Sequence, residues 1–123
     1  MTLLFVFAGS SLAGPCDDAW KVYLAGDYAK TKILVEPSAE AGEAACQAIL
    51  GTLYLNAQGV AKDYVEAEKW LRKAAVQGNS GGQQALGWLY VNGWGVKQDY
   101  AKALEWYQKA LAQNDSYAMS GLG

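Results

Sequence analysis

A 36-residue internal repeat constrains this chain more than any other feature of its sequence. The positions that match at this interval are Leu50/Leu86, Gly51/Gly87, Leu53/Leu89, Tyr54/Tyr90, Gly59/Gly95, Val60/Val96, Asp63/Asp99, Tyr64/Tyr100, Ala67/Ala103, Trp70/Trp106 and Ala74/Ala110. A fixed period in this range is typical of a solenoid, in which each repeat buries its apolar face against the next. The same interval aligns Asp27-Tyr28 with Asp63-Tyr64, so three helix starts are predicted in register.

Each repeat unit is predicted to be two short helices joined by a turn that contains glycine. Asp63 suits an N-cap, and Glu66 three residues later would complete a capping box. Gly51 and Gly87 lie inside predicted helices, where glycine is destabilising, so we interpret them as sites of close helix approach. The apolar residues that follow Asp63 fall on one helical face: Ala67, Trp70, Leu71, Ala74, Ala75 and Gly78.

The period predicts an all-α fold, with one repeat domain over residues 15–123. We expect helices over residues 43–58, 64–77, 80–92 and 100–113, and a further first helix from residue 117. The first repeat is degenerate, and we interpret it as an N-terminal cap, since terminal repeats are often atypical. The predicted units are residues 15–42, 43–78 and 79–114, with residues 115–123 beginning another repeat.

The pattern Leu-Gly-x-Leu-Tyr, followed by Gly-Val-x-x-Asp-Tyr-x-x-Ala-x-x-Trp, resembles the Sel-1-like repeat (SLR), a relative of the tetratricopeptide repeat (TPR). The resemblance covers residues 19–123 and implies an α/α solenoid with a concave, ligand-facing surface. Family members generally serve as adaptors or scaffolds for other proteins, and many bacterial members are exported. The sequence departs from the pattern at Ala57, where the next repeat has Gly93, and at Cys46 and Gly82, which replace the usual alanine.

Residues 1–14 are predicted to be an export signal, with a short apolar core followed by the small residues Ser11-Leu12-Ala13, which suit cleavage. The positively charged part of such a signal is missing, because no Lys or Arg precedes Lys21. The alternative is a frayed apolar N-terminus. No other apolar run approaches the ~20 residues needed to cross a bilayer. We therefore expect a periplasmic or secreted bacterial protein without a transmembrane segment after signal removal.

The chain has two cysteines, Cys16 and Cys46. An even count behind an export signal favours a structural disulfide, because exported proteins fold in an oxidising compartment. Cys46 takes a small packed position in its helix, and Cys16 begins the first helix of the preceding repeat, so the two could approach each other. Two free buried thiols are the alternative. A redox pair fits less well, since the spacing matches no redox motif.

Composition argues against several classes of function. The chain has no histidine, which removes His-based triads, most zinc sites and the commonest general base at neutral pH. Its net charge is −2 and no basic run occurs, so a nucleic-acid surface is not expected. Gly93-Trp94-Gly95 contains a Gly-x-Gly, but it joins two helices and is interpreted as a turn. We expect no enzyme, no metal and no cofactor.

The partner-binding surface is predicted from residues of the first helices that vary between the copies. Trp88 replaces Thr52, which puts a large amphipathic side chain where packing does not fix the residue; the alternative is that Trp88 covers a neighbouring repeat. Trp94 lies between two turn glycines and is hard to bury there, and exposed aromatic residues are good interface anchors. The predicted partner-binding residues are Gln47, Thr52, Asn56, Gln84, Trp88, Asn92 and Trp94.

Three functions follow from these observations. The first is an exported adaptor that binds a protein or peptide on the concave surface of its first helices. The second is an immunity-type inhibitor of an effector enzyme. The third is a cell-envelope enzyme acting on peptidoglycan-like substrates, a kind of activity proposed for cysteine-rich relatives. The lack of histidine and of any nucleophile–base pair weighs against the third.

Overall fold

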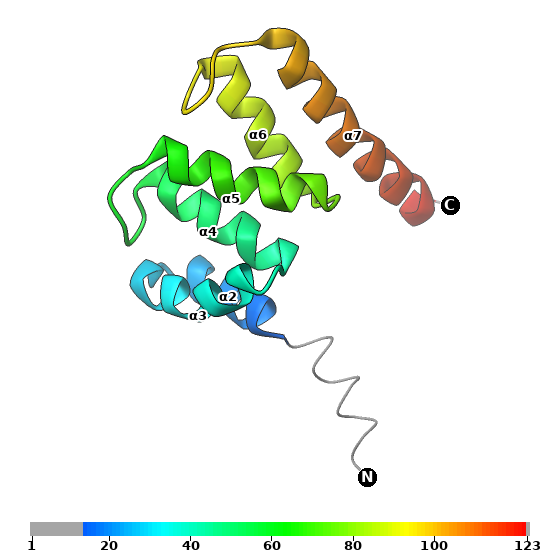
Figure 1. Cartoon of the computed structure of the whole chain (residues 1–123). Coiled ribbons are helices and arrows are strands. Elements are labelled where there is room, and N and C mark those ends of the chain that lie inside the picture. Colours follow the sequence, from blue (N-terminus) through cyan, green and yellow to red (C-terminus); the bar gives the residue numbers. More distant parts are fainter. Residues whose placement is uncertain (1–13, 123) are drawn as a thin grey trace.

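The computed structural model describes residues 14–122, with side chains described up to residue 113. Residues 1–13, which hold almost all of the predicted signal, and Gly123 lie outside the described residues. Within the described part the chain forms helices and no strand (Figure 1). The helices are α2 (Pro15–Leu24), α3 (Tyr28–Glu40), α4 (Ala44–Asn56), α5 (Tyr64–Val76), α6 (Ser80–Asn92) and α7 (Tyr100–Leu122).

The helices stack in chain order as three antiparallel pairs. Figure 1 shows α2 and α3 at one end, α4 and α5 in the middle, and α6 and α7 at the other end. Each helix packs mainly against its neighbours in the sequence, and the first helices α2, α4 and α6 also contact one another. The predicted all-α solenoid of helix-turn-helix repeats is therefore confirmed.

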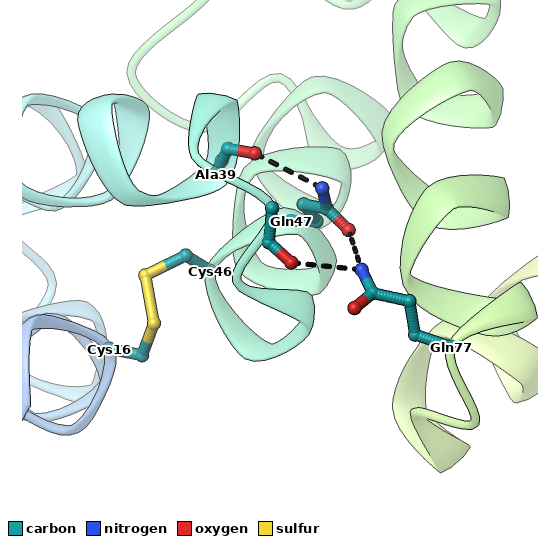
Figure 2. Close-up of a disulfide and its surroundings, with 6 residues drawn as sticks. Cys16, Ala39, Cys46, Gln47 and Gln77 are labelled. Carbon is teal, nitrogen blue, oxygen red and sulfur yellow. Dashed lines mark hydrogen bonds between the residues drawn. A yellow bond between two sulfur atoms is a disulfide. The ribbon is translucent and has the colours of Figure 1, made fainter. Parts of the chain in front are cut away.

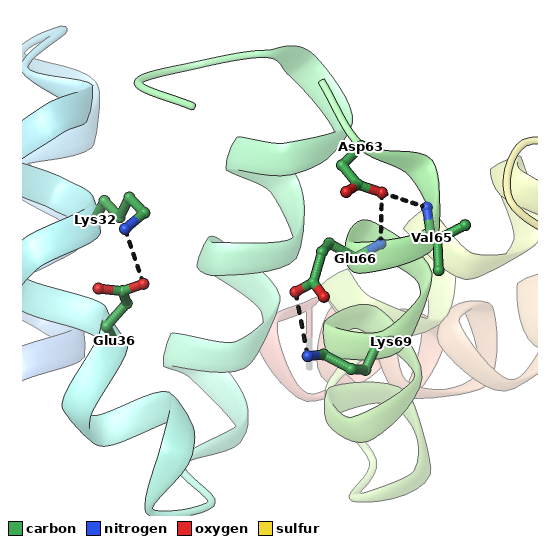
Figure 3. Close-up of polar contacts among 6 residues, drawn as sticks. All are labelled: Lys32, Glu36, Asp63, Val65, Glu66 and Lys69. Atoms are coloured by element: carbon green, nitrogen blue, oxygen red, sulfur yellow. Dashed lines mark hydrogen bonds and ion pairs between the residues drawn. The ribbon is translucent and has the colours of Figure 1, made fainter. Parts of the chain in front are cut away.

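Aspartate residues in register cap the second helix of every repeat. The Asp63 carboxylate accepts the backbone N–H groups of Val65 and Glu66, both at 3.0 Å (Figure 3). Asp27 and Asp99 accept N–H groups in the first turns of α3 and α7 in the same way. Capping satisfies donors that have no partner inside the helix, which explains why the aspartate recurs at a fixed interval.

The predicted capping box at Glu66 is wrong. In such a box the Glu66 side chain would accept the backbone N–H of Asp63. That N–H instead donates to the Tyr54 carbonyl oxygen at 3.1 Å, which ties the start of α5 to α4. The Glu66 carboxylate is left to pair with Lys69 Nζ at 3.2 Å (Figure 3).

Two helical glycines lie where first and second helices approach most closely, as predicted. A Cβ atom at Gly51 would lie 2.6 Å from Cγ of Leu71, and one at Gly87 would lie 2.9 Å from the Tyr107 ring. Carbon atoms in contact need about 3.5–4.0 Å, so a side chain at either site would require the Leu71 side chain or the Tyr107 ring to move, or the helices to separate. The destabilising effect of glycine within each helix is the cost of this contact.

Ala57 keeps the turn of the second repeat in spite of its side chain. It ends α4 in the left-handed conformation, at φ 56° and ψ 46°, and Gly93 ends α6 at φ 69° and ψ 35°. The departure from the repeat pattern at this position therefore changes the residue and not the path of the backbone.

Cys16 and Cys46 form a disulfide that joins α2 to α4 (Figure 2). Their Cα atoms are 5.1 Å apart, within the usual range for a disulfide. The bond closes a loop that contains the whole of α3 and links the degenerate first repeat covalently to the second.

Gln47 lies beside the disulfide and connects three helices through its side-chain amide. Its Nε2 donates to the Ala39 carbonyl oxygen of α3 at 3.1 Å, and its Oε1 accepts from Gln77 Nε2 at 2.8 Å (Figure 2). Gln77, at the end of α5, also donates to the Gly42 carbonyl oxygen at 3.0 Å. We call this chain of bonds the glutamine relay.

The glutamine relay recurs one period later. Gln83 Nε2 donates to the Ala75 carbonyl oxygen at 3.2 Å, and Gln113 Nε2 donates to Gln83 Oε1 at 2.9 Å. Gln113 also donates to the Gly78 carbonyl oxygen at 2.8 Å. The polar part of the interior thus repeats with the same interval as the apolar part.

The prediction that Gln47 binds a partner is wrong, because its side chain is 4% exposed and belongs to the relay. A buried amide must keep its hydrogen bonds, which explains its position. Gln47 and Gln83 are identical at the 36-residue interval, and this identity was the sequence signal for a packing role.

Helix α7 also differs from its prediction. The sequence predicted an end near residue 113 and a new first helix from residue 117, whereas α7 continues to Leu122. Helices α3 and α5 are each followed by a turn with a glycine at strongly positive φ, Gly42 at 105° and Gly78 at 97°. The equivalent position is Asn114, for which such a φ is less favourable, and the helix runs on.

Substitution of Gln47 tests whether the glutamine relay stabilises the fold. Gln47→Ala leaves the Ala39 carbonyl oxygen and the Gln77 amide without this partner in the interior. We expect the free energy of unfolding to fall by about 1–3 kcal/mol. The exposed Gln84 is the matched control, and Gln84→Ala should change stability by less than about 0.5 kcal/mol. Urea denaturation of both variants measures the difference, and equal midpoints would contradict the relay.

Candidate partner-binding surface

Five of the predicted binding residues form one stripe along the two neighbouring first helices. Thr52 and Asn56 lie four residues apart on α4, and Gln84, Trp88 and Asn92 follow the same interval on α6. This spacing places side chains on one face of a helix, and equivalent faces of successive repeats turn the same way. Thr52 is partly buried and the other four residues are exposed, Trp88 by 56%. We call these five residues the first-helix stripe.

The first-helix stripe carries no charge. Helices α4 and α6 contain no Asp, Glu, Lys or Arg. Two of the stripe's polar side chains are held by their own helix: Thr52 Oγ1 donates to the Ala48 carbonyl oxygen at 2.8 Å, and Asn92 Nδ2 donates to the Trp88 carbonyl oxygen at 3.0 Å. The surface therefore offers amide groups and an aromatic ring rather than ionic contacts.

The side chain of Trp94 is less exposed, and so less available to a partner, than its position between two glycines predicted. Its ring stacks on Tyr64, with centroids 5.1 Å apart and planes 4° from parallel, and it is partly buried. Gly95 brings the turn against the start of α5, since a Cβ there would lie 2.5 Å from the Tyr64 carbonyl oxygen. Trp94 therefore acts first as a support for the turn. Tyr64 was not predicted as part of this surface, because its stacking depends on the path of the turn.

Trp88 stands next to this stacked pair. Its ring meets Trp94 edge-on, with centroids 6.3 Å apart and planes at 72°. Edge-to-face contacts of this kind are favourable beyond the area they bury. The contact leaves more than half of the Trp88 side chain exposed. The alternative, in which Trp88 mainly covers a neighbouring repeat, is therefore wrong.

A pocket of about 360 Å³ lies between α6 and α7, with Trp88 in its lining. Gln84 and Trp88 line it together with Gly81, Ala85 and Tyr107. A tyrosine hydroxyl is neutral at neutral pH, and burial raises the pKa of the Tyr107 hydroxyl further from that range. Tyr107 was not among the predicted binding residues. The available signal was that it replaces Leu71 of the preceding repeat, adding a polar tip to a packing position.

Metal-ligating and thiol groups can be checked within the described residues. Among them no three His, Cys, Asp or Glu side chains lie close enough together to hold a metal ion. Cys16 and Cys46 are bonded to each other, so neither is a free thiol. None of the helices in residues 14–122 is both long and apolar enough to span a membrane.

Comparison with known proteins adds a family and two structural relatives. The family model for the Sel1 repeat matches residues 44–79 and 80–115. The crystal structure of a Sel1 repeat protein from Oxalobacter formigenes is similar, with 31% identity and a TM-score of 0.76 over 81% of this chain. So is that of a protective antigen of uropathogenic Escherichia coli strains with an SLR fold, with 35% identity and a TM-score of 0.73 over 85% of this chain.

Both relatives are longer proteins. The chain spans 40% of the Oxalobacter formigenes protein and 24% of the Escherichia coli antigen. A search of curated protein sequences gave no match.

Proposed function

The chain belongs to the Sel1 repeat family, and from this membership we propose that it is an exported adaptor or scaffold module that binds a protein or peptide on its first-helix stripe. Sel1 repeat proteins generally mediate protein–protein interactions as scaffolds. The observation that carries the proposal is the exposure of Trp88, at 56%, on an uncharged face beside a pocket.

Trp88 is suited to be the central anchor of such an interface. Tryptophan is among the residues that contribute most to binding when an interface buries them. Its edge contact with Trp94 limits the freedom of the ring before binding, so less conformational entropy is lost on association. The pocket that Trp88 lines can take a side chain of the partner, with the neutral Tyr107 hydroxyl available as a hydrogen-bonding group.

The amides of the stripe suggest what the partner presents. Asn56, Gln84 and Asn92 are exposed side chains that can both donate and accept hydrogen bonds. Such groups match the backbone of a peptide segment or its polar uncharged side chains. With no charge on α4 or α6, a charged partner segment would lose hydration without gaining an ion pair. The favoured partner segment is therefore uncharged, with one bulky side chain for the pocket.

A location outside the cytoplasm agrees with the disulfide. Disulfides persist in oxidising compartments, such as the bacterial periplasm and the extracellular medium. Cys16 and Cys46 are joined in this fold. Together with the signal-like sequence of residues 1–14, the bond supports a periplasmic or secreted protein. An immunity-type inhibitor would use the same surface, and it differs in that its partner would be an enzyme whose activity falls on binding.

Substitution of Trp88 tests the proposed surface. The partner is first isolated from a cell-envelope extract with the full chain and identified, and its affinity is then measured by calorimetry. We expect Trp88→Ala to weaken binding by about 30-fold or more, the effect of losing a central aromatic anchor. Trp20 on α2 is the matched control, because it is 49% exposed and lies outside the stripe. Trp20→Ala should stay within about twofold. Equal losses for the two variants would overturn the proposed surface.

The salt dependence of binding tests the chemistry of the partner segment. An interface without ionic contacts should change little when salt screens charges, so Kd should vary by less than about threefold between about 0.05 and about 0.5 M NaCl. A steep weakening over this range would show that charged residues outside the stripe carry the interaction.

A further inference from the structure

The last repeat leaves a large apolar face on α7 uncovered. Tyr100, Leu104 and Leu111 are each more than half exposed, and Tyr107 between them is partly exposed. Their spacing of four, three and four residues places them on one side of the helix. We call these four residues the α7 stripe. Exposed apolar residues that form a continuous face mark a surface that another element covers.

The preceding repeat shows what covers this face. Leu71 and Ala75 of α5 precede Tyr107 and Leu111 by one period, and both are buried in a cluster with Leu86 of α6. The contact is close, since a Cβ at Gly82 of α6 would lie 2.9 Å from the Cβ of Ala74. A first helix therefore covers the second helix before it by placing a small residue over its backbone.

The C-terminal residues of the chain repeat the sequence with which α6 begins. Asp115 stands at the position of Asn79, whose side chain caps α6 by accepting the Gly82 N–H at 2.8 Å. Aspartate is an equally good cap. Ala118 stands at the position of Gly82, the small residue of the close contact. The pairs at this interval are Asp115/Asn79, Ser116/Ser80, Ala118/Gly82 and Leu122/Leu86.

Gln113 near the end of the third repeat makes the same hydrogen bonds as Gln77 at the end of the second repeat. Gln77 bonds Gln47 and the Gly42 carbonyl, and the chain then turns at Gly78 into α6. Gln113 makes the equivalent bonds, yet α7 continues. The difference in sequence at the turn is Asn114 in place of Gly78, and asparagine is among the non-glycine residues that best tolerate positive φ.

We propose that residues 116–122 are a first-helix segment that docks on Tyr107 and Leu111 of the α7 stripe, with the chain turning at Asn114-Asp115, in equilibrium with the continuous α7. Its seat is the part of the stripe formed by Tyr107 and Leu111, the counterparts of Leu71 and Ala75. Docking covers the apolar side chains of these two residues, which favours the turned form. The positive φ required of Asn114 favours the continuous helix. The occupant is the chain's own segment, and this inference does not depend on the proposed adaptor function.

A pair of engineered cysteines distinguishes the two forms. Residues 110 and 118 are eight apart, so in a continuous helix their Cα atoms are separated by about 12 Å along the axis, beyond the reach of a disulfide. In the docked form Ala118 meets Ala110 as Gly82 meets Ala74. We expect full-length Ala110→Cys/Ala118→Cys, with the native disulfide intact, to form a second intramolecular disulfide under mild oxidation. Intact mass and peptide mapping detect it.

Ser120 provides the matched control, because it corresponds to the exposed Gln84 rather than to the close contact. Ala110→Cys/Ser120→Cys should cross-link much more slowly. Within the Ala110→Cys/Ala118→Cys protein, Asn114→Gly should speed cross-linking about fivefold and Asn114→Ala should slow it by a similar factor. Each change alters the balance between turn and helix by about 1 kcal/mol.

The possible outcomes decide the proposal. Rapid intramolecular cross-linking that follows the residue at position 114 supports it. Absence of the second disulfide, a rate equal to that of the Ser120 control, or no response to the residue at 114 would overturn it. A disulfide between two chains would also overturn it, by assigning the α7 stripe to a second copy. Circular dichroism of each variant confirms that the helices are retained.

Discussion

The fold depends on one contact that is made twice, a large side chain of a second helix against a glycine of the first. Leu71 lies against Gly51, and Tyr107 lies against Gly87 one period later. Because these glycines have no side chain, the two helices of a repeat approach closely enough for the rest of the unit to meet. Only at this separation can the polar bonds between helices form, since hydrogen bonds tolerate little change in distance.

The same interval organises the polar groups, and this explains where binding residues can lie. Aspartate caps begin the second helices, and the glutamine relay joins α4 and α6 to the second helices on both sides of each. Positions used in this way hold the same residue in both copies. A position whose residue changes freely, such as Thr52 and Trp88, lies outside these contacts. The candidate surface is therefore centred on a position that differs between the copies, Thr52 and Trp88, while Asn56 and Asn92 in the same stripe are identical.

Most of the architecture could be predicted from the sequence, because identical residues at a fixed interval leave few other folds. The candidate surface was less predictable. Gln47 was assigned to it as a residue that varies between the copies, although Gln83 is the same residue one period later, and its buried hydrogen bonds give it a packing role. The stacking of Trp94 on Tyr64 depends on the path of a turn, which short-range patterns do not define. The continuation of α7 depends on a single residue, Asn114 in place of glycine, whose effect is too small to read from sequence alone.

Removal of one period tests the central claim that the 36-residue interval is the structural unit. Deletion of residues 51–86 joins Leu50 to Gly87 and keeps the disulfide, Gln47 and Gln113 in register. The account predicts that this shorter chain unfolds cooperatively in urea with helical content per residue close to that of the full chain. Deletion of residues 51–84, which joins Leu50 to Ala85 and shifts the register, should give a chain without a cooperative transition. Two deletions that behave alike would contradict the account.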